Sequence, residues 1–416
     1  MCHQKSCYHQ LMVCFTVLIV SLSFVFFTGN GIAQVSSETK GRPKPTPTPK
    51  PTPSPIPTPT PTPTPVVSFS GGVGLFFPIT PLSDDNLRYW FTPNVEKAAN
   101  FGMKFVNLIV HWQDLEPQNG VYTFDMLERY MQAIRVSGLQ CVLRIYFNGG
   151  WHIQASPDWL FDEKGAAFCW EGDYRQPLPW DNTYSKEMTS FMDALATWMA
   201  ADTKRKPQAL QVSAGGCYGE MAVLGFDWQT IFQNDYDQFY NLLTTANKVH
   251  VDVFAAFSKK LALTPLILMI NHLYDNNPAM NDQLMNYAWN TYGMRWFQSN
   301  SWSGELEVQW YGPLILDMME RHASGGVFLL EDEYGFNSET LEQRIVRIER
   351  IYSETGIRFR SVSLNLGDLT AANEAKIRYL QSWIQSGTTL YTAKGHNSYF
   401  PYAPSPSGGG LGWGFK

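Results

Sequence analysis

The stretch Gly325-Gly-Val-Phe-Leu-Leu-Glu-Asp-Glu-Tyr-Gly-Phe336 joins an apolar run directly to three acidic residues. The run from Val327 to Leu330 predicts a strand buried on both faces, which is the pattern of a parallel sheet. Side chains alternate along a strand, so Glu331 and Glu333 share one orientation and Asp332 takes the other. If the sheet closes into a barrel, one of the two glutamates faces its axis, and the pattern leaves the choice between them open.

The same alternation of a short apolar run with a longer amphipathic stretch recurs from residue 66 onward. Strands are expected at residues 72–76, 105–111, 141–147, 209–214, 263–270, 294–298, 327–331 and 359–364. Helices are expected between them, at residues 126–136, 186–200, 237–259, 312–321, 338–352 and 371–385. Eight such repeats predict a (β/α)8 barrel over residues 66–416, in which the active site lies on the rim formed by the carboxyl ends of the strands.

The first 65 residues have a different composition. Lys5 precedes an apolar run from Leu11 to Phe27, and small residues end at Ala33, which predicts a secretion signal over residues 1–33. The alternative is an uncleaved, outward-facing membrane anchor. Residues 34–65 contain a proline and threonine repeat that has little to bury, which predicts a disordered linker capable of tethering the domain to a cell surface. We therefore expect a secreted or extracellular protein.

Composition excludes several classes of function. The formal net charge is −6 and no basic patch alternates with aromatics, so nucleic acid is not an expected partner. No Cys-x-x-Cys spacing or phosphate-binding loop occurs, so neither a metal nor a cofactor is expected. Cys141 is expected to be a buried free thiol, whereas Cys169 and Cys217 lie in expected loops and an exported protein could pair them. The oligomeric state is not indicated.

A second acid follows the fourth expected strand, in Ser213-Ala-Gly-Gly-Cys-Tyr-Gly-Glu220. The glycines indicate a tight bend that brings Glu220 to the rim, and no other charge occurs between Ala214 and Leu224. Such a setting disfavours ionisation and raises the pKa of a carboxyl group. One protonated and one ionised carboxyl are what cleavage of a glycosidic bond requires, although each acid taken alone fits a solvated loop equally well.

The loop after the second expected strand carries a more specific pattern. It contains His111-Trp-Gln-Asp-Leu-Glu-Pro117 and then Gly120-Val-Tyr-Thr-Phe-Asp125, with Asp125 expected to cap the next helix and Glu116 expected to brace the loop. The chain here resembles the clan A glycoside hydrolases, particularly the family of bacterial beta-galactosidases and its relatives. The segments Val142-Leu-Arg-Ile-Tyr146 and Pro157-Asp-Trp-Leu160 are similar to the third strand and following loop of the same enzymes.

The resemblance implies an acid/base after strand four and a nucleophile after strand seven, which are Glu220 and Glu333 by position. Glu333-Tyr-Gly335 is similar to the triplet around the nucleophile in several clan members, which favours Glu333 over Glu331. The chain departs from the clan at Gly219, where most members have an asparagine that contacts the sugar.

Further residues are expected to bind the substrate from the ends of strands or from rim loops. They are His111, Trp112, Arg144, Trp151, Asn271, His272, Gln298, Trp302 and Glu331. The long loop at residues 148–181 is expected to form one wall of the cleft, with Trp170 and Trp180 as additional stacking platforms.

The sequence thus predicts a secreted, retaining glycoside hydrolase that acts on a β-linked oligo- or polysaccharide. A non-catalytic carbohydrate-binding surface protein on a degenerate barrel is the alternative, favoured by Gly219 and by the proline-rich linker. Neither the sugar and its linkage nor exo or endo action follows from the sequence.

Overall fold

The computed structural model describes residues 69–77, 81–149, 153–213, 215–216, 232–233, 235–262, 265–270, 278–299, 319, 321–322, 326–332 and 339–386. The chain divides into two compact units, Met1–Val66 and Val67–Lys416, and every described residue belongs to the second. The expected signal segment and linker therefore lie outside the described residues.

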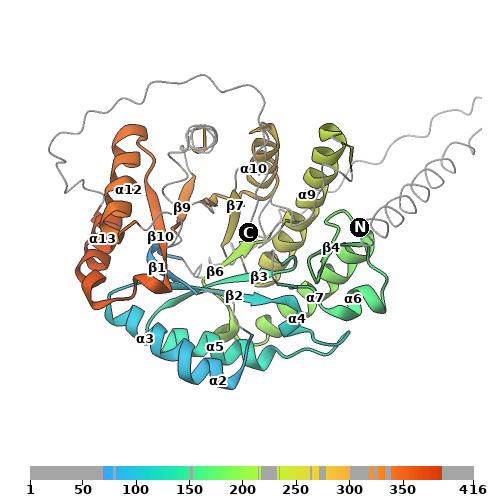
Figure 1. The fold of residues 1–416 in the computed structure, drawn as a ribbon, viewed down its shortest axis with the longest axis horizontal. Helices are drawn as coiled ribbons and strands as arrows, with labels where there is room; N and C mark the ends of the chain where they lie inside the picture. Colours follow the sequence, from blue (N-terminus) through green and yellow to red (C-terminus); the bar gives the residue numbers. More distant parts are fainter. Residues whose placement is uncertain are drawn as a thin grey trace, which may run out of the picture. The chain divides into compact units, whose positions relative to one another are not determined.

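Eight parallel strands close into a barrel in the order β1-β10-β9-β8-β7-β6-β3-β2 (Figure 1). They are β1 (Gly72–Phe76), β2 (Phe105–His111), β3 (Gln140–Tyr146), β6 (Ala209–Val212), β7 (Leu266–Ile270), β8 (Trp296–Ser299), β9 (Val327–Asp332) and β10 (Phe359–Asn365). Each strand coincides with one of the expected strands, with small differences at the ends. The prediction of a (β/α)8 barrel is confirmed.

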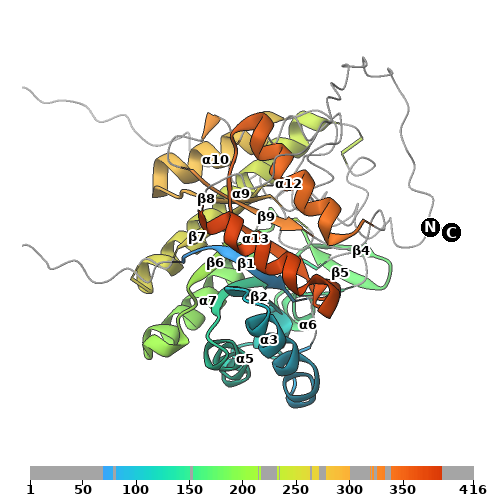
Figure 2. The same ribbon diagram turned by 90° about the vertical axis from the view of Figure 1, so that its left-hand side faces the viewer.

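Helices cover the outside of the barrel, and Figure 2 shows α13 lying over β1. The longer helices are α3 (Thr92–Asn100), α5 (Phe124–Val136), α7 (Asn182–Ala200), α9 (Tyr236–Lys260), α10 (Pro278–Tyr292), α12 (Leu341–Thr355) and α13 (Glu374–Ser386). The sequence predicted five of these but neither α3 nor α10, and its helix at residues 312–321 lies almost wholly outside the described residues. Among the described residues, no helix has the length and apolar character needed to cross a membrane.

Several short elements complete the described structure. They are α2 (Asp84–Asn86), the π-helix η1 (Leu87–Phe91), α4 (Trp112–Leu115), α6 (Asp158–Asp162), η2 (Thr203–Arg205), η5 (Leu366–Asp368), η6 (Ala371–Asn373) and an antiparallel hairpin of β4 (Phe168–Glu171) and β5 (Tyr174–Pro177). The start of α5 corrects one expectation. Thr123 occupies its N-cap position, and Asp125 lies in the first turn, where an acid still favours the helix dipole.

Alternate residues of each strand point outward and pack against the helices. On β2, Val106, Leu108 and Val110 are buried in the main apolar cluster together with Leu127 and Met131 of α5. These two α5 residues are four positions apart and therefore lie on the same face of the helix. Burying one such side chain contributes about 1.5–3 kcal/mol, so these packed faces stabilise the barrel.

The other residues of the strands point into the barrel, whose amino-terminal end is apolar. A separate cluster there contains Phe69, Phe105, Val142, Ala209, Ile267 and Leu329. The rings of Phe69 and Phe105 meet edge to face at 5.2 Å, so Phe69 closes this end of the barrel. Gly74 is required beside them, because a Cβ atom at this position would lie 2.2 Å from the Phe105 ring.

Above this apolar layer the barrel interior is polar and charged. Arg144 of β3 and Glu331 of β9 are each 1% exposed, and Nη1 of the arginine lies 3.2 and 3.1 Å from the two carboxylate oxygens. Nε2 of Gln298 donates to Glu331 Oε2 at 2.5 Å, and Nε2 of Gln211 donates to Gln298 Oε1 at 2.5 Å. Four strands are therefore connected by one buried network of hydrogen bonds around an ion pair.

Breaking this ion pair is expected to destabilise the barrel strongly. Glu331→Gln keeps the size of the side chain but leaves the buried charge of Arg144 without its carboxylate, and the expected loss in unfolding free energy is about 3–5 kcal/mol. The matched control is Asp193→Asn, which breaks the exposed Lys260–Asp193 pair and should cost under about 1 kcal/mol. Equilibrium urea unfolding measures both. Equal losses in the two variants would show that the buried pair has no special role.

Candidate active site

The rim at the carboxyl ends of β2 and β3 carries His111 and Tyr146. His111 is 5% exposed, and its ring stacks on that of Tyr146 with 6.1 Å between the centroids. Its Nδ1 lies 3.5 Å from a carboxylate oxygen of Asp114, and its Nε2 has no hydrogen-bond partner among the described residues. A buried imidazole nitrogen of this kind is suited to bind a ligand hydroxyl, so His111 remains a candidate for substrate contact.

Three other residues expected to bind substrate lie deeper in the barrel. Arg144, Gln298 and Glu331 are each only 1% exposed and are hydrogen bonded to one another as described above. Side chains buried to this degree support the rim from beneath. Their expected contact with a sugar stays a prediction.

The expectation for Trp112 is corrected, because its ring is completely buried outside the barrel strands. It packs edge to face against Phe147 and Trp159, with centroid distances of 5.4 and 5.6 Å. The indole Nε1 donates to Glu116 Oε2 at 2.8 Å. A ring with no exposed face cannot stack on a sugar, so Trp112 serves packing and holds Glu116.

Glu116 has the bracing role that the sequence predicted. Its second carboxylate oxygen accepts from the backbone N–H of Gly120 at 2.9 Å, and its own carbonyl accepts from Trp159 Nε1 at 3.0 Å. Burial raises the pKa of this carboxyl, while the hydrogen bonds from Trp112 and Gly120 oppose that shift. The carboxylate of Glu116 therefore braces the loop after β2, and its backbone carbonyl joins that loop to α6.

The long loop after β3 contains α6 and the β4–β5 hairpin, which lie beside each other in Figure 2. Gln176 on the buried face of the hairpin accepts from the backbone N–H of Gly149 at 3.1 Å and donates to the carbonyl of Ile153 at 3.2 Å. These contacts hold both ends of the segment that contains Trp151. Trp170 is 36% exposed on the other face, whereas the ring of Trp180 packs 5.6 Å from that of Phe232.

Two further groups on the hairpin are buried. Glu171 is 8% exposed, and its Oε2 accepts from Gln176 Nε2 at 3.4 Å, while Oε1 has no hydrogen-bond partner among the described residues. Burial raises the pKa of this carboxyl to about 7.

Cys169 is disulfide-bonded, as a pairing with Cys217 requires, although Cys217 itself lies outside the described residues. Cys141 is free and buried, as predicted.

The remaining predicted site residues lie outside the described residues. They are Glu220, Glu333, Trp151, Asn271, His272 and Trp302, together with Gly219. Their roles stay predictions.

Sequence reasoning missed Gln211, Glu171 and His250. The burial of Gln211 could have been predicted, because a polar residue inside an apolar strand must find a buried hydrogen-bond partner. Glu171 and His250 had no such signal, since an acid in a short loop segment and a histidine within a long helix are both ordinary in sequence. Only the folded chain shows that each is buried.

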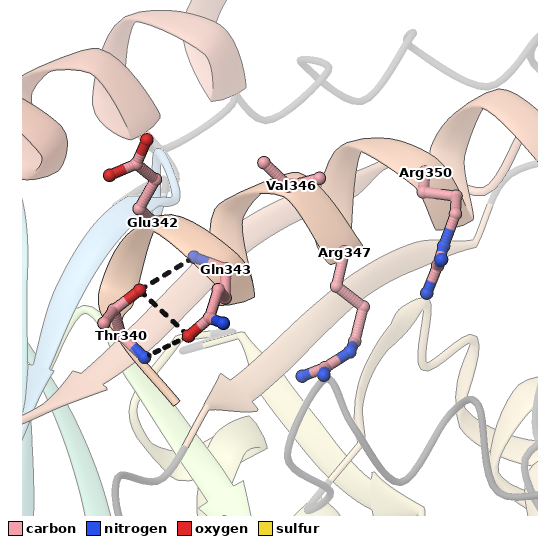
Figure 3. A pocket seen from close by; sticks show the side chains of 6 residues that line it. All are labelled: Thr340, Glu342, Gln343, Val346, Arg347 and Arg350. Atoms are coloured by element: carbon pink, nitrogen blue, oxygen red, sulfur yellow. Dashed lines mark hydrogen bonds between the residues drawn. The ribbon is translucent and has the colours of Figure 1, made fainter. Parts of the chain in front are cut away.

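One recess on the surface does not contribute to this site. It runs along the outside of α12 and is lined by Thr340, Glu342, Gln343, Val346, Arg347 and Arg350 (Figure 3). Thr340 and Gln343 are engaged in the capping box of the helix, and Arg347 pairs with Glu339. Across the described part of the chain, no cluster of three side chains is suited to hold a metal ion.

The buried Glu171 predicts a specific dependence of stability on pH. Between about pH 4.5 and about pH 7 the folded protein retains a proton that the unfolded chain releases, so the free energy of unfolding falls as pH rises through this window. Glu171→Gln removes this contribution and should lose less stability than the parent protein between about pH 5 and pH 8. Urea unfolding at both pH values tests this. If the free energy of unfolding falls equally in the parent and in Glu171→Gln, Glu171 titrates normally.

Comparison with protein families supports the resemblance seen in the sequence. Residues 88–212 match the family model of glycoside hydrolase family 42, described as beta-galactosidase. This range includes the Leu115-Glu-Pro117 loop and the Pro157–Leu160 segment. No match was found among curated proteins.

Solved structures share the barrel at low sequence identity. The catalytic domain of beta-amylase from Paenibacillus polymyxa is 14% identical with a TM-score of 0.55, covering 74% of this chain and 95% of that domain. Beta-galactosidase from the psychrophilic Marinomonas ef1 is 12% identical with a TM-score of 0.52, covering 76% of this chain and 59% of the enzyme.

Beta-galactosidase from Rahnella sp. R3 is also 12% identical, with a TM-score of 0.54, and the match covers 77% of this chain and 57% of the enzyme. The chain thus spans somewhat more than half of the length of these two galactosidases. Over residues 88–212 the chain is similar to the beta-galactosidase family, and its barrel is the (β/α)8 fold shared by the clan A glycoside hydrolases.

Proposed function

We propose that the protein is a retaining glycoside hydrolase of β-linked oligo- or polysaccharides, with Glu220 as acid/base and Glu333 as nucleophile. The observation that carries the proposal is the orientation of Glu331 at the end of β9. Glu331 points into the barrel, is 1% exposed and is hydrogen bonded to Arg144 and Gln298, which favours Glu333 over Glu331 as the nucleophile. If the alternation of β9 continued one residue past its end at Asp332, Glu333 would take the same side, one step nearer the rim.

The closed parallel barrel supports the pairing of the two acids. Glu220 follows β6, the fourth barrel strand along the chain, and Glu333 follows β9, the seventh. The carboxyl ends of parallel strands lie on the same rim, where the active sites of such barrels are built. The positions correspond to those that the resemblance to clan A assigns to the acid/base and the nucleophile.

The proposed reaction proceeds by two displacements at the anomeric carbon. Glu333 attacks this carbon as Glu220 gives its proton to the leaving oxygen, and a covalent glycosyl-enzyme forms. Glu220 then takes a proton from water, whose oxygen displaces Glu333 and releases the sugar. Both carboxyl groups return to their starting states, and the configuration at the anomeric carbon is retained.

The substrate class rests on the similarity to beta-galactosidases over residues 88–212. His111 would contact a sugar hydroxyl through its unpaired Nε2. Trp151, Asn271, His272 and Trp302 are proposed to complete the binding site from the rim loops.

A second candidate function is carbohydrate binding without turnover. Gly219 favours it, because most clan members have an asparagine there that contacts the sugar. The proline-rich linker also suits a protein tethered to a cell surface.

We also propose that the protein acts outside the cell, released by cleavage after Ala33 or held by an uncleaved anchor. The disulfide at Cys169 supports this location, because such bonds persist in oxidising compartments.

The assignment of the two acids is tested by kinetics on a panel of aryl β-glycosides, with the full-length protein and its variants. Glu333→Gln should lower kcat by about 10⁴-fold or more, because it removes the attacking carboxylate. Glu220→Gln removes the general acid, which typically contributes about 10²–10⁴-fold. Asp332→Asn, one residue earlier in the chain, is the matched control and should remain active. Proton NMR of the first product should show the β-anomer.

Two results would overturn the assignment. If both Glu220→Gln and Glu333→Gln retain full activity, the acids are misassigned. If the parent protein binds members of a glycan array without turning any of them over, the binding function replaces the enzymatic one.

The proposed location is tested by expressing the full chain in a secreting host. Amino-terminal sequencing of the protein from the medium should begin at Gln34. Retention of the whole product inside the cell would contradict an extracellular site of action, whereas recovery in the membrane fraction with the barrel accessible to protease would identify the anchored form.

A further inference from the structure

The chain that leaves β6 is held by side chains of neighbouring elements. Ser213, the residue after the strand, donates its hydroxyl to the carbonyl of Ile145 on β3. The backbone N–H of Gly215 donates to Asn247 Oδ1 at 2.9 Å, and the carbonyl of Gly215 accepts from Asn148 Nδ2 at 3.0 Å. Asn247 lies on α9, and Asn148 follows β3. Both polar backbone groups of Gly215 are thus satisfied by buried side chains.

His250, one turn along α9 from Asn247, makes a further contact with the same segment. Its Nδ1 lies 2.9 Å from the carbonyl oxygen of Ser213, and because a carbonyl only accepts, Nδ1 must carry the proton. The ring is completely buried, and this burial lowers the pKa of His250 to about 4. The imidazole therefore stays neutral with its tautomer fixed, and the ring of Tyr184 packs against it at 5.7 Å.

Gly215 approaches its surroundings too closely to carry a side chain. A Cβ atom at this position would lie 2.6 Å from Cβ of Pro179. The backbone is thus pressed against the end of the long third loop while Asn247 and Asn148 hold its polar groups. Steric contact and hydrogen bonds together fix where the chain leaves the barrel.

We propose that His250 and Asn247 are positioning residues that set the place and direction from which the segment carrying Glu220 departs. The inference rests on the proposed function, because it assigns this segment to the general acid. Neither residue touches the substrate in this proposal. They act through the backbone of Ser213 and Gly215, and a displacement of about 1 Å at a catalytic group can reduce the rate by about 100-fold.

The proposal predicts a loss that depends on the leaving group. Departure of phenol from a phenyl glycoside needs a proton, whereas dinitrophenolate leaves without one. His250→Phe keeps an aromatic ring but removes the donor, so kcat/KM for the phenyl glycoside should fall by about tenfold or more while that for the dinitrophenyl glycoside changes little. His250→Asn keeps a donor near Nδ1 and should restore most of the loss.

The experiment uses the full-length protein and the phenyl and dinitrophenyl glycosides of a sugar that the parent hydrolyses. Asn247→Leu is the second variant, in case His250→Phe does not fold, and should show the same selective loss. The matched control is Gln381→Leu, which breaks a buried hydrogen bond to the backbone N–H of Val73 on β1. It should affect both substrates equally, as a purely structural change does.

Glu220→Gln on the same two substrates separates the possible failures. If Glu220→Gln shows no greater loss on the phenyl glycoside, the proposed function fails and the positioning role fails with it. If Glu220→Gln is selective but His250→Phe and Asn247→Leu lower both rates equally, only the positioning role is wrong. Failure of His250→Asn to restore activity above that of His250→Phe would also contradict it.

Discussion

The ion pair between Arg144 and Glu331 is the constraint on which the interior of the barrel depends. Two opposite charges removed from water stabilise each other, because a buried charge without its counter-ion costs several kcal/mol. Gln298 and Gln211 extend the network to two further strands. The pair therefore connects β3 with β9, and the amides connect β8 with β6. The strands that precede Glu220 and Glu333 are joined beneath the rim by this one network.

The loops at the rim above this layer are positioned in another way, by hydrogen bonds from polar side chains to the loop backbone. Glu116 holds Gly120 after β2, Gln176 holds Gly149 and Ile153 after β3, and Asn247 and His250 hold the exit of β6. A loop has few backbone partners of its own, so a buried side chain from a rigid element gives it a defined position. The functional loops thus depend on helices and on a hairpin that do not themselves face the barrel axis.

The sequence predicted the barrel because most described strand residues are buried on both faces, which leaves apolar runs that are visible without any knowledge of pairing. It did not predict the β4–β5 hairpin, since Phe168–Glu171 and Tyr174–Pro177 are only four residues long each and show no clear alternation. It also placed Trp112 at the sugar site. The short helix α4 begins directly at this residue and turns its ring away from the barrel into the aromatic cluster around Trp159.

The number of strands and their order along the chain could be read from the sequence alone, because the repeated apolar runs are local features. Period-two alternation is also local, and from it the sequence predicts that Glu331 and Glu333 share an orientation. The burial of Glu331, which is 1% exposed, could not be read from the sequence. Its partners come from other strands, with Arg144 lying 187 residues away along the chain, and no local pattern reports how deep in the barrel a side chain ends. The same reason separates His111, at the rim, from Arg144, in the interior, although both alternate inward on neighbouring strands. Depth in a closed barrel depends on the stagger of all its strands, which forms only when the sheet closes.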